Sequence, residues 1–137
     1  MSSPRTSIQL IRSSTLASPV SYAYAAVAHH VSRLIVTAGA CPLDEDGVVV
    51  AVGDVAGQTE RVMTNLRLAL QAAQADLTDV IKTTVYVSSH RREDLHAAWS
   101  VVRRHFGDHD PPGTLLGVAV LGYPHQLVEV EAVAALP

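Results

Sequence analysis

The sequence predicts an α+β domain in which a mixed sheet carries two helices on one face. Its 137 residues are enough for one domain with a substantial core. Hydrophobic patterns give the order strands, helix, strand, helix and two strands. Each predicted helix has a single apolar stripe, so both can be buried on the same side of the sheet. We expect one domain spanning residues 1–137.

The composition excludes several classes of protein. Hydrophobic residues make up 48% of the chain and charged residues 17%, which is unlike a disordered chain. The formal net charge is −3, with both signs interspersed, so no nucleic-acid partner is expected. No apolar run is long enough to cross a membrane, and the N-terminus lacks the apolar segment of a secretory signal. With one cysteine, Cys41, these features predict a soluble cytoplasmic protein.

Short strand-like segments fill the first third of the chain. Runs of β-branched or alternating residues, bounded by turn residues, predict each of them. His29 and His30 form one turn, and the acidic, glycine-containing segment 42–47 forms another. The predicted strands cover residues 8–11, 22–28, 33–37 and 48–51.

The first helix is predicted to begin after Asp54, whose side chain can cap it, and to run to about residue 75. Apolar residues recur there at helical spacing and form one stripe. The stripe consists of Val55, Val62, Leu66, Ala69 and Ala73.

The second half of the chain predicts strands over residues 80–87, 114–121 and 127–134. The first of them is almost entirely β-branched and too short for a helix. A second helix over residues 89–106 precedes the other two and is stopped by Gly107. Its apolar face consists of Leu95, Ala98, Trp99, Val102 and Phe106.

The predicted sheet keeps one face free of helices. In the strand 80–87 one set of alternate residues is Ile81, Thr83, Val85 and Val87, and the other is Val80, Lys82, Thr84 and Tyr86. Helices can cover only one of these faces. The other is mixed rather than fully polar, which favours association with further copies of the chain.

Seven segments together resemble the Rid (RidA/YjgF-like) superfamily across nearly the whole chain. The strand Lys-Thr-Thr-Val and the ending Val-Glu-Val-Glu-Ala are the most specific of them. The segments begin at Tyr22, Val36, Gly53, Gln58, Val80, Phe106 and Val128. The resemblance implies a chorismate-mutase-like fold and a homotrimer with three clefts at subunit interfaces. It also implies hydrolysis of reactive enamines and imines to a keto acid and ammonia, with no metal or organic cofactor.

The resemblance also assigns roles to residues. The family's water-positioning glutamate corresponds to Glu129 and its early pocket aromatic to Tyr22. Its carboxylate-binding arginine corresponds to Gly113 or Thr114, depending on the placement of a gap, and no Lys or Arg follows Arg104.

Two further family positions differ in this chain. The family's serine corresponds to Ala38, and its asparagine to Trp99. Without an arginine clamp a buried substrate carboxylate has no partner. We therefore expect a neutral or less acidic substrate, other than 2-aminoacrylate.

Each candidate residue also has a structural interpretation. Glu129 and Glu131 can form a solvent-facing polar edge, or Glu129 can act as a general base. Trp99 can belong to the core or to a cleft wall, and Tyr22 to an interface or a ligand site. Gly113 before Thr114 can serve a tight turn, or free backbone amides for an oxyanion.

The cysteine and the histidines give weaker evidence of a functional site. Cys41 has no activating base near it in the sequence, so a small buried side chain is favoured over a nucleophile. His105 and His109 are separated by a helix stop, and no third ligand is evident for a metal.

The leading hypothesis is a cofactor-independent enzyme that hydrolyses or tautomerises a small imine, enamine or related carbonyl metabolite. Glu129 would handle water or a proton. Thr114 and the backbone at Gly113 would hold the polar end of the substrate. Tyr22 and Trp99 would form the walls of the pocket. The alternative is a non-catalytic trimeric module that binds a metabolite or a partner protein. A ribonuclease fits poorly with a net negative chain.

Overall fold

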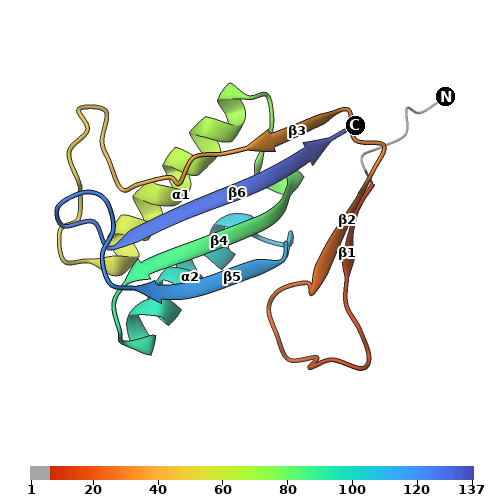
Figure 1. The fold of residues 1–137 in the computed structure, drawn as a ribbon, viewed down its shortest axis with the longest axis horizontal. Coiled ribbons are helices and arrows are strands. Elements are labelled where there is room, and N and C mark those ends of the chain that lie inside the picture. Colours follow the sequence, from red (N-terminus) through yellow and green to blue (C-terminus); the bar gives the residue numbers. More distant parts are fainter. Residues whose placement is uncertain (1–6) are drawn as a thin grey trace.

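A four-stranded mixed sheet forms the centre of the computed structural model, which describes residues 7–137. The strand order is β3-β6-β4-β5. β6 pairs antiparallel with both β3 and β4, whereas β4 and β5 are parallel (Figure 1). The bounds are Arg33–Val36 for β3, Val80–Ser88 for β4, Gly113–Val118 for β5 and Val128–Leu136 for β6.

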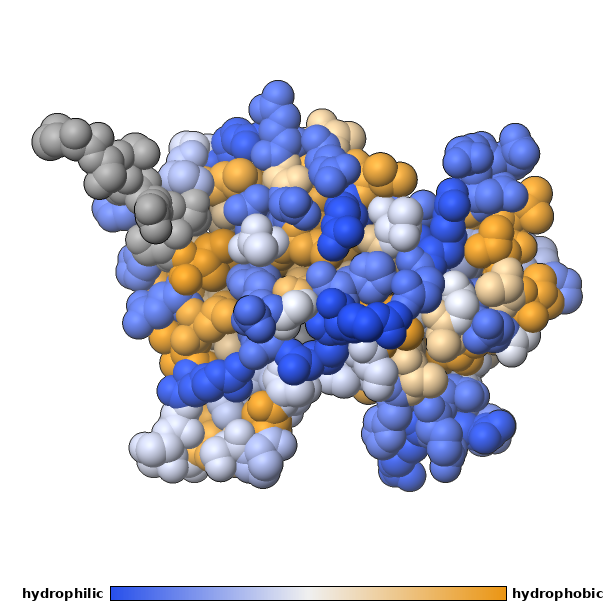
Figure 2. All heavy atoms as spheres, turned by 180° about the vertical axis from the view of Figure 1, so that it is seen from behind, coloured by the Kyte–Doolittle hydropathy of each residue, from blue (hydrophilic) through white to orange (hydrophobic). Residues whose placement is uncertain are grey.

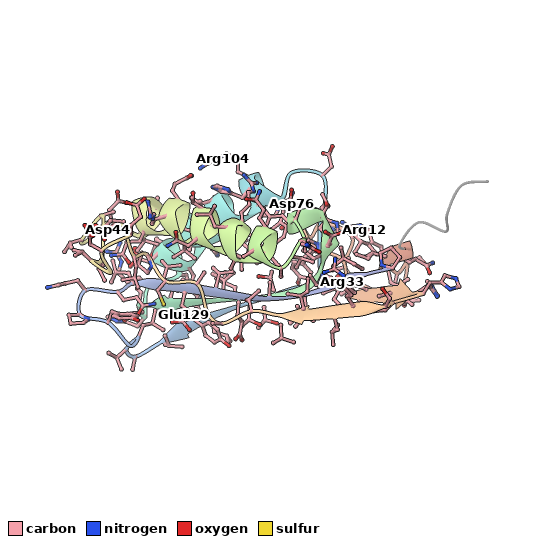
Figure 3. All side chains as sticks on the ribbon, turned by 90° about the horizontal axis from the view of Figure 1, so that it is seen from above. Arg12, Arg33, Asp44, Asp76, Arg104 and Glu129 are labelled. Carbon is pink, nitrogen blue, oxygen red and sulfur yellow. The ribbon has the colours of Figure 1, made fainter. Side chains whose placement is uncertain are left out.

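Both long helices, α1 (Val55–Ala72) and α2 (Arg92–Phe106), cover the same face of this sheet (Figure 3). A 3₁₀ turn, η1 (Leu77–Asp79), leads into β4. This arrangement confirms the α+β prediction. Figure 2 shows that the helical side of the molecule is largely hydrophilic, as expected for helices with one buried stripe each.

The core lies between the helices and the sheet. Met63, Leu66 and Leu70 from α1 are fully buried there against alternate residues of the strands. The strand residues of the core include Val80, Val85, Val87, Val128, Val130, Ala132 and Ala134.

A hairpin of β1 (Ser7–Ile11) and β2 (Ala25–His29) forms a separate two-stranded sheet (Figure 1). Only three residues separate β2 from β3, yet the two strands belong to different sheets. His30 has a φ of 56°, a left-handed backbone that redirects the chain between them. The hairpin therefore stands beside the main sheet.

The strand predicted over residues 22–28 begins only at Ala25, so Tyr22 precedes it, and the strand predicted over residues 114–121 ends at Val118. Three further expectations about local structure were wrong. Residues 48–51 form no strand, because they lie in a loop whose turn is held by the Asp44 carboxylate. One isolated bridge, between Leu43 and Val49, involves this segment. Ala69 is exposed, because the buried stripe of α1 runs through Val62, Met63, Leu66 and Leu70 instead.

The third error concerns Val80, which is fully buried rather than sharing a face with Lys82. A β-bulge between these two residues shifts the register, so that Val80 pairs with Ala134 and Lys82 with Val133. An extra residue in one strand reverses the alternation at that point.

The face of the sheet opposite the helices, here called the open face, is mixed as predicted. Residues of β4 and β6 that point away from the core alternate with buried ones. Val36 on β3 is 71% exposed and Leu34 is 63% exposed. The open-face residues of the two central strands are Lys82, Thr84, Tyr86, Glu129, Glu131 and Val133.

The cap of α1 gives a test of the local fold. Asp54 accepts a hydrogen bond of 3.0 Å from the backbone N–H of Gly57. We expect Asp54→Ala to lower the free energy of unfolding by about 1 kcal/mol in urea titrations at fixed protein concentration, because an N-terminal amide loses its partner. Asp46→Ala removes the same charge from the preceding loop without touching a helix, and an equal loss there would contradict the capping role.

Candidate functional site

A hollow at the free edge of β5, here called the edge hollow, brings together four of the five residues predicted for the site. Its volume is about 450 Å³. It lies at the outer edge of β5, beside the first residues of that strand, and it is bordered by the middle of α2. The hollow is lined by Tyr22, His96, Trp99, Gly113, Thr114 and Leu115.

Aromatic packing builds the inner wall of the edge hollow. The Tyr22 and Trp99 rings meet edge to face, with centroids 6.2 Å apart and an interplanar angle of 86°. The Trp99 Nε1–H donates a hydrogen bond of 3.1 Å to Ser21 Oγ. Trp99 therefore packs against the core and also lines the hollow, so its two interpretations coexist.

Gly113 is required by the close approach of this tryptophan. A Cβ atom at Gly113 would lie 2.7 Å from Trp99 Cη2 and 3.4 Å from Thr83 Cγ2. The Gly113 Cα thus faces the helical side of the sheet, whereas Thr114 pairs with the open-face residue Thr84. Of the two positions that can correspond to the missing arginine, only Thr114 projects its side chain toward the open face.

An ion cluster fixes the loop that carries Tyr22. The Asp110 carboxylate pairs with Arg103 on α2 and with Arg12 at 2.9 Å. Arg12 also donates a hydrogen bond of 3.0 Å to the backbone oxygen of Tyr22, and Ala23 N–H donates one of 3.1 Å to the backbone oxygen of Asp110. The segment before β2 is thereby tied to the loop that leads into β5.

Glu129 lies elsewhere, on the open face of β6 (Figure 3). Its Oε1 accepts a hydrogen bond of 3.1 Å from Gln126 Nε2 and one of 3.4 Å from Cys41 Sγ. Gln126 is itself only 4% exposed. A Cβ atom at Gly39 would lie 2.2 Å from Glu129 Oε2, so a glycine is needed for the carboxylate to fit there. The carboxylate is held in a defined orientation.

Cys41 is a protonated thiol in this environment. Burial and the neighbouring Glu129 carboxylate raise the pKa of Cys41 to about 11. The thiol is therefore a hydrogen-bond donor to Glu129 at neutral pH, which supports the interpretation that it is not a nucleophile. The sequence could not show this contact, because 88 residues separate the partners.

One subunit does not unite Glu129 with the edge hollow. Glu129 pairs across the sheet with Tyr86 of β4, which pairs in turn with Leu116 of β5. Neighbouring strands lie about 4.8 Å apart, so Glu129 is roughly 10 Å from the edge strand. Tyr22, Trp99, Gly113 and Thr114 thus form one half of the predicted site, and Glu129 forms the other.

Lys82 is a candidate that the sequence analysis missed. Its Nζ donates a hydrogen bond of 2.6 Å to Thr114 Oγ1. Lys82 also lines a hollow of about 250 Å³ on the open face, together with Thr37, Thr84 and Glu131. The signal was present in the alternation of residues 80–87, but the pairing of β4 with β5 was needed to interpret it.

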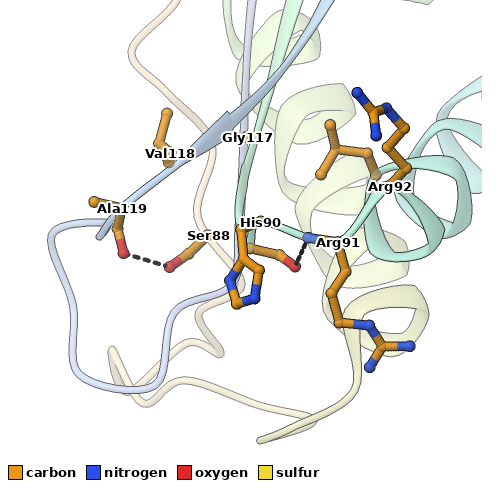
Figure 4. A pocket seen from close by; sticks show the side chains of 9 residues that line it. Ser88, His90, Arg91, Arg92, Gly117, Val118 and Ala119 are labelled. Carbon is orange, nitrogen blue, oxygen red and sulfur yellow. Dashed lines mark hydrogen bonds between the residues drawn. The ribbon is translucent and has the colours of Figure 1, made fainter.

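Another hollow, of about 680 Å³, lies at the carboxyl ends of β4 and β5 (Figure 4). Ser88 Oγ donates to the Ala119 oxygen at 3.2 Å, and Ser89 Oγ accepts from Arg91 N–H at 3.0 Å. His90 and Arg92 complete an exposed basic rim. None of the residues predicted for the site lies there.

The two histidines considered as metal ligands, His105 and His109, make structural contacts instead. His105 Nε2 lies 3.0 Å from Glu60 Oε2, and burial together with Arg67 and Arg104 lowers the pKa of His105. His109 Nε2 contacts the backbone oxygen of Val80 at 2.7 Å, so the two histidines do not converge. Within residues 7–137 no group of three or more His, Cys, Asp or Glu side chains is placed to hold a metal ion.

Comparison with known proteins identifies the family. The family model described as endoribonuclease L-PSP matches residues 15–136. The chain belongs to this family. The resemblance to the Rid superfamily is thereby confirmed, since solved members carry that name and share the fold.

Individual relatives agree with this assignment. The Rid-family protein YyfB of Yersinia pestis superposes with a TM-score of 0.86 at 28% identity, over 93% of this chain and 98% of that one. A RutC family protein of Pyrococcus abyssi is 34% identical over 76% of this chain and 80% of its own. The 3-aminoacrylate deaminase RutC of Acinetobacter baylyi is 29% identical over 74% and 79%.

Between residues 7 and 137, no helix combines the length and the apolar character needed to cross a bilayer.

The contact between Cys41 and Glu129 can be tested by alkylation. The thiol should react slowly with iodoacetamide at pH 8 and faster as the pH rises toward 11, because the thiolate reacts. Glu129→Gln removes a charge that raises this pKa. It should therefore increase the rate at pH 9 several-fold, followed by mass spectrometry. Glu131→Gln on the same face is the control, and an equal acceleration there would contradict the contact.

Proposed function

We propose that this member of the family is an enzyme that hydrolyses or tautomerises a small imine, enamine or related carbonyl metabolite, with Glu129 as its general base. The observation that carries the proposal is the Glu129 carboxylate, fixed by Gln126 and Cys41 on the open face. A carboxylate held in this way can accept a proton from water. One relative of the chain is a 3-aminoacrylate deaminase, which agrees with this chemistry.

The reaction needs one water and no redox partner. Glu129 takes a proton from water as the oxygen attacks the imine carbon. Return of that proton to nitrogen gives the neutral amino alcohol. Its hydroxyl proton then passes to nitrogen through Glu129 as the C–N bond breaks, so ammonia leaves and a C=O bond replaces the C=N bond. An enamine first becomes the imine by gaining a proton at its β-carbon and losing one from nitrogen, and that step alone is the tautomerisation. No metal or organic cofactor is required by this chemistry.

We propose that the site is completed between copies in a homotrimer. Glu129 and the edge hollow lie on different strands of one subunit, so a second copy is needed to bring them together. The exposed apolar side chains of Leu34 and Val36 lie on β3 beside the open face. Burying such a patch against a sister subunit is favourable. Tyr22 and Trp99 would then wall a substrate whose polar end lies near Thr114.

A non-catalytic binding module remains the alternative. It is favoured by one observation, namely that Thr114 and Gly113 occupy the place of the family's arginine. Such a module would use the same edge hollow for a metabolite or a partner protein. For both alternatives we propose, from the composition, a cytoplasmic protein that has no nucleic-acid or membrane partner.

Ammonia release separates enzyme from binding module. Purified protein should accelerate the release of ammonia from freshly generated 2-imino acids, measured in a coupled assay. Glu129→Gln should lower kcat by about 10² to 10⁴, because general base catalysis is lost. Glu45→Gln should retain most activity, since Glu45 is exposed on the loop before α1 and lines neither the edge hollow nor the open-face hollow. Tight binding of such compounds without any turnover would favour the module.

The trimer can be tested by light scattering after gel filtration. The expected mass is three times the 14.6 kDa chain. Val36→Asp should shift the protein to lower mass, because it places a charge in the proposed interface. Val48→Asp, which alters an exposed loop residue, should not. A wild-type protein that elutes as a single subunit would contradict the proposal.

A further inference from the structure

We propose that Lys82 is the anion-binding group of this site, and that the substrate consequently carries a carboxylate. The reaction itself rests on the function proposed above. This inference reverses the expectation of a neutral substrate, which followed from the missing arginine. In place of a guanidinium at position 113 or 114, the ammonium would come from the neighbouring strand β4.

The ammonium of Lys82 has donors to spare. It carries three N–H groups, and Thr114 Oγ1 accepts one of them at 2.6 Å. Over residues 7–137, no carboxylate lies within 4.0 Å of Lys82 Nζ, since the ion pairs of that region belong to Arg12, Arg67, Arg91, Arg103, Arg104 and His105. Thr114 therefore orients the ammonium without neutralising it.

The nearest acidic neighbour on the open face is bound to another group. Glu131 lies on β6 opposite Thr84 and diagonal to Lys82. Its Oε1 accepts a hydrogen bond of 2.6 Å from the Tyr86 hydroxyl. That hydrogen bond raises the pKa of Tyr86, so the phenol remains a donor at neutral pH. Glu131 is thus directed at Tyr86, and Lys82 at Thr114.

Among the strands of the main sheet, Lys82 provides the basic side chain on the open face. The four-stranded sheet contains two Lys or Arg side chains, Arg33 on β3 and Lys82 on β4. Arg33 donates to the backbone oxygens of Ala73 and Gln74, beyond the end of α1. The positive charge near Thr114 therefore comes from Lys82 alone among these strands.

The position of the ammonium links the two halves of the site. Lys82 lines the hollow on the open face, and its partner Thr114 lines the edge hollow. An anion bound at Lys82 would leave the rest of a small ligand beside Tyr22 and Trp99. Charge-assisted hydrogen bonds are roughly twice as strong as neutral ones, and an ammonium can donate to a carboxylate without bidentate geometry. A three- or four-carbon 2-imino or 2-keto acid fits this description.

Binding of pyruvate, an unreactive 2-keto acid, tests the assignment without requiring turnover. Lys82→Gln should weaken pyruvate binding by roughly 10- to 100-fold in NMR or calorimetric titrations, because a charged hydrogen bond is lost. Binding of the neutral pyruvamide should change less than about 2-fold. Lys82→Arg should restore part of the affinity for pyruvate. Arg92→Gln removes one positive charge from the separate basic hollow and should leave both ligands unaffected.

The outcomes distinguish this inference from the proposed function. Unchanged pyruvate affinity in Lys82→Gln, or an equal loss for pyruvate and pyruvamide, overturns the role of Lys82 even where wild-type protein releases ammonia. Selective loss of pyruvate binding supports the role even where no imine is turned over. In an active enzyme, Lys82→Gln should raise KM for 2-imino acids far more than it lowers kcat. Unchanged mass and circular dichroism of the variant show that the fold is intact.

Discussion

The alternation of buried and open-face residues in β6 from Val128 to Val133 is the constraint on which the rest of the structure depends. Val128, Val130, Ala132 and Ala134 are buried beneath the helices, so Glu129 and Glu131 are forced onto the opposite face. A shift of one residue in its pairing with β4 would exchange these two sets, placing carboxylates in the core. Since an unpaired carboxylate is costly to bury, the hydrophobic core fixes the position of the proposed base.

The edge hollow and the surroundings of Glu129 are two distinct environments that do not meet within one subunit. At the free edge of β5, two aromatic rings and a glycine form a hollow whose shape depends on the absence of a side chain at position 113. Two strands away, Glu129 is fitted against Gly39 and held by Gln126 and Cys41. Both environments are held by specific contacts within the subunit. This separation is the physical basis for proposing a site that is shared between copies.

The loss of an arginine need not remove the positive charge from such a site. Strand pairing brings Lys82 to the side chain of Thr114, although 32 residues separate them. An ammonium is more strongly hydrated than a guanidinium and lacks its rigid fork, so the geometry of anion binding would be less demanding. A site built in this way would accept a wider range of small acids than one with a bidentate clamp.

The sequence alone determined the family, the order of elements and the placement of both helices on one face, because these depend on local periodicity and on short motifs. It also determined which residues were candidates, and four of them meet in one hollow. The β-bulge at Ile81, the loop at residues 48–51 and the contacts Cys41–Glu129 and Lys82–Thr114 were decided by the tertiary structure. The bulge and the two side-chain contacts depend on the register between segments far apart in the chain, whereas the loop depends on hydrogen bonds to the Asp44 carboxylate that periodicity does not reveal. Periodicity predicts which face a residue takes, but only strand pairing decides which residue lies beside it.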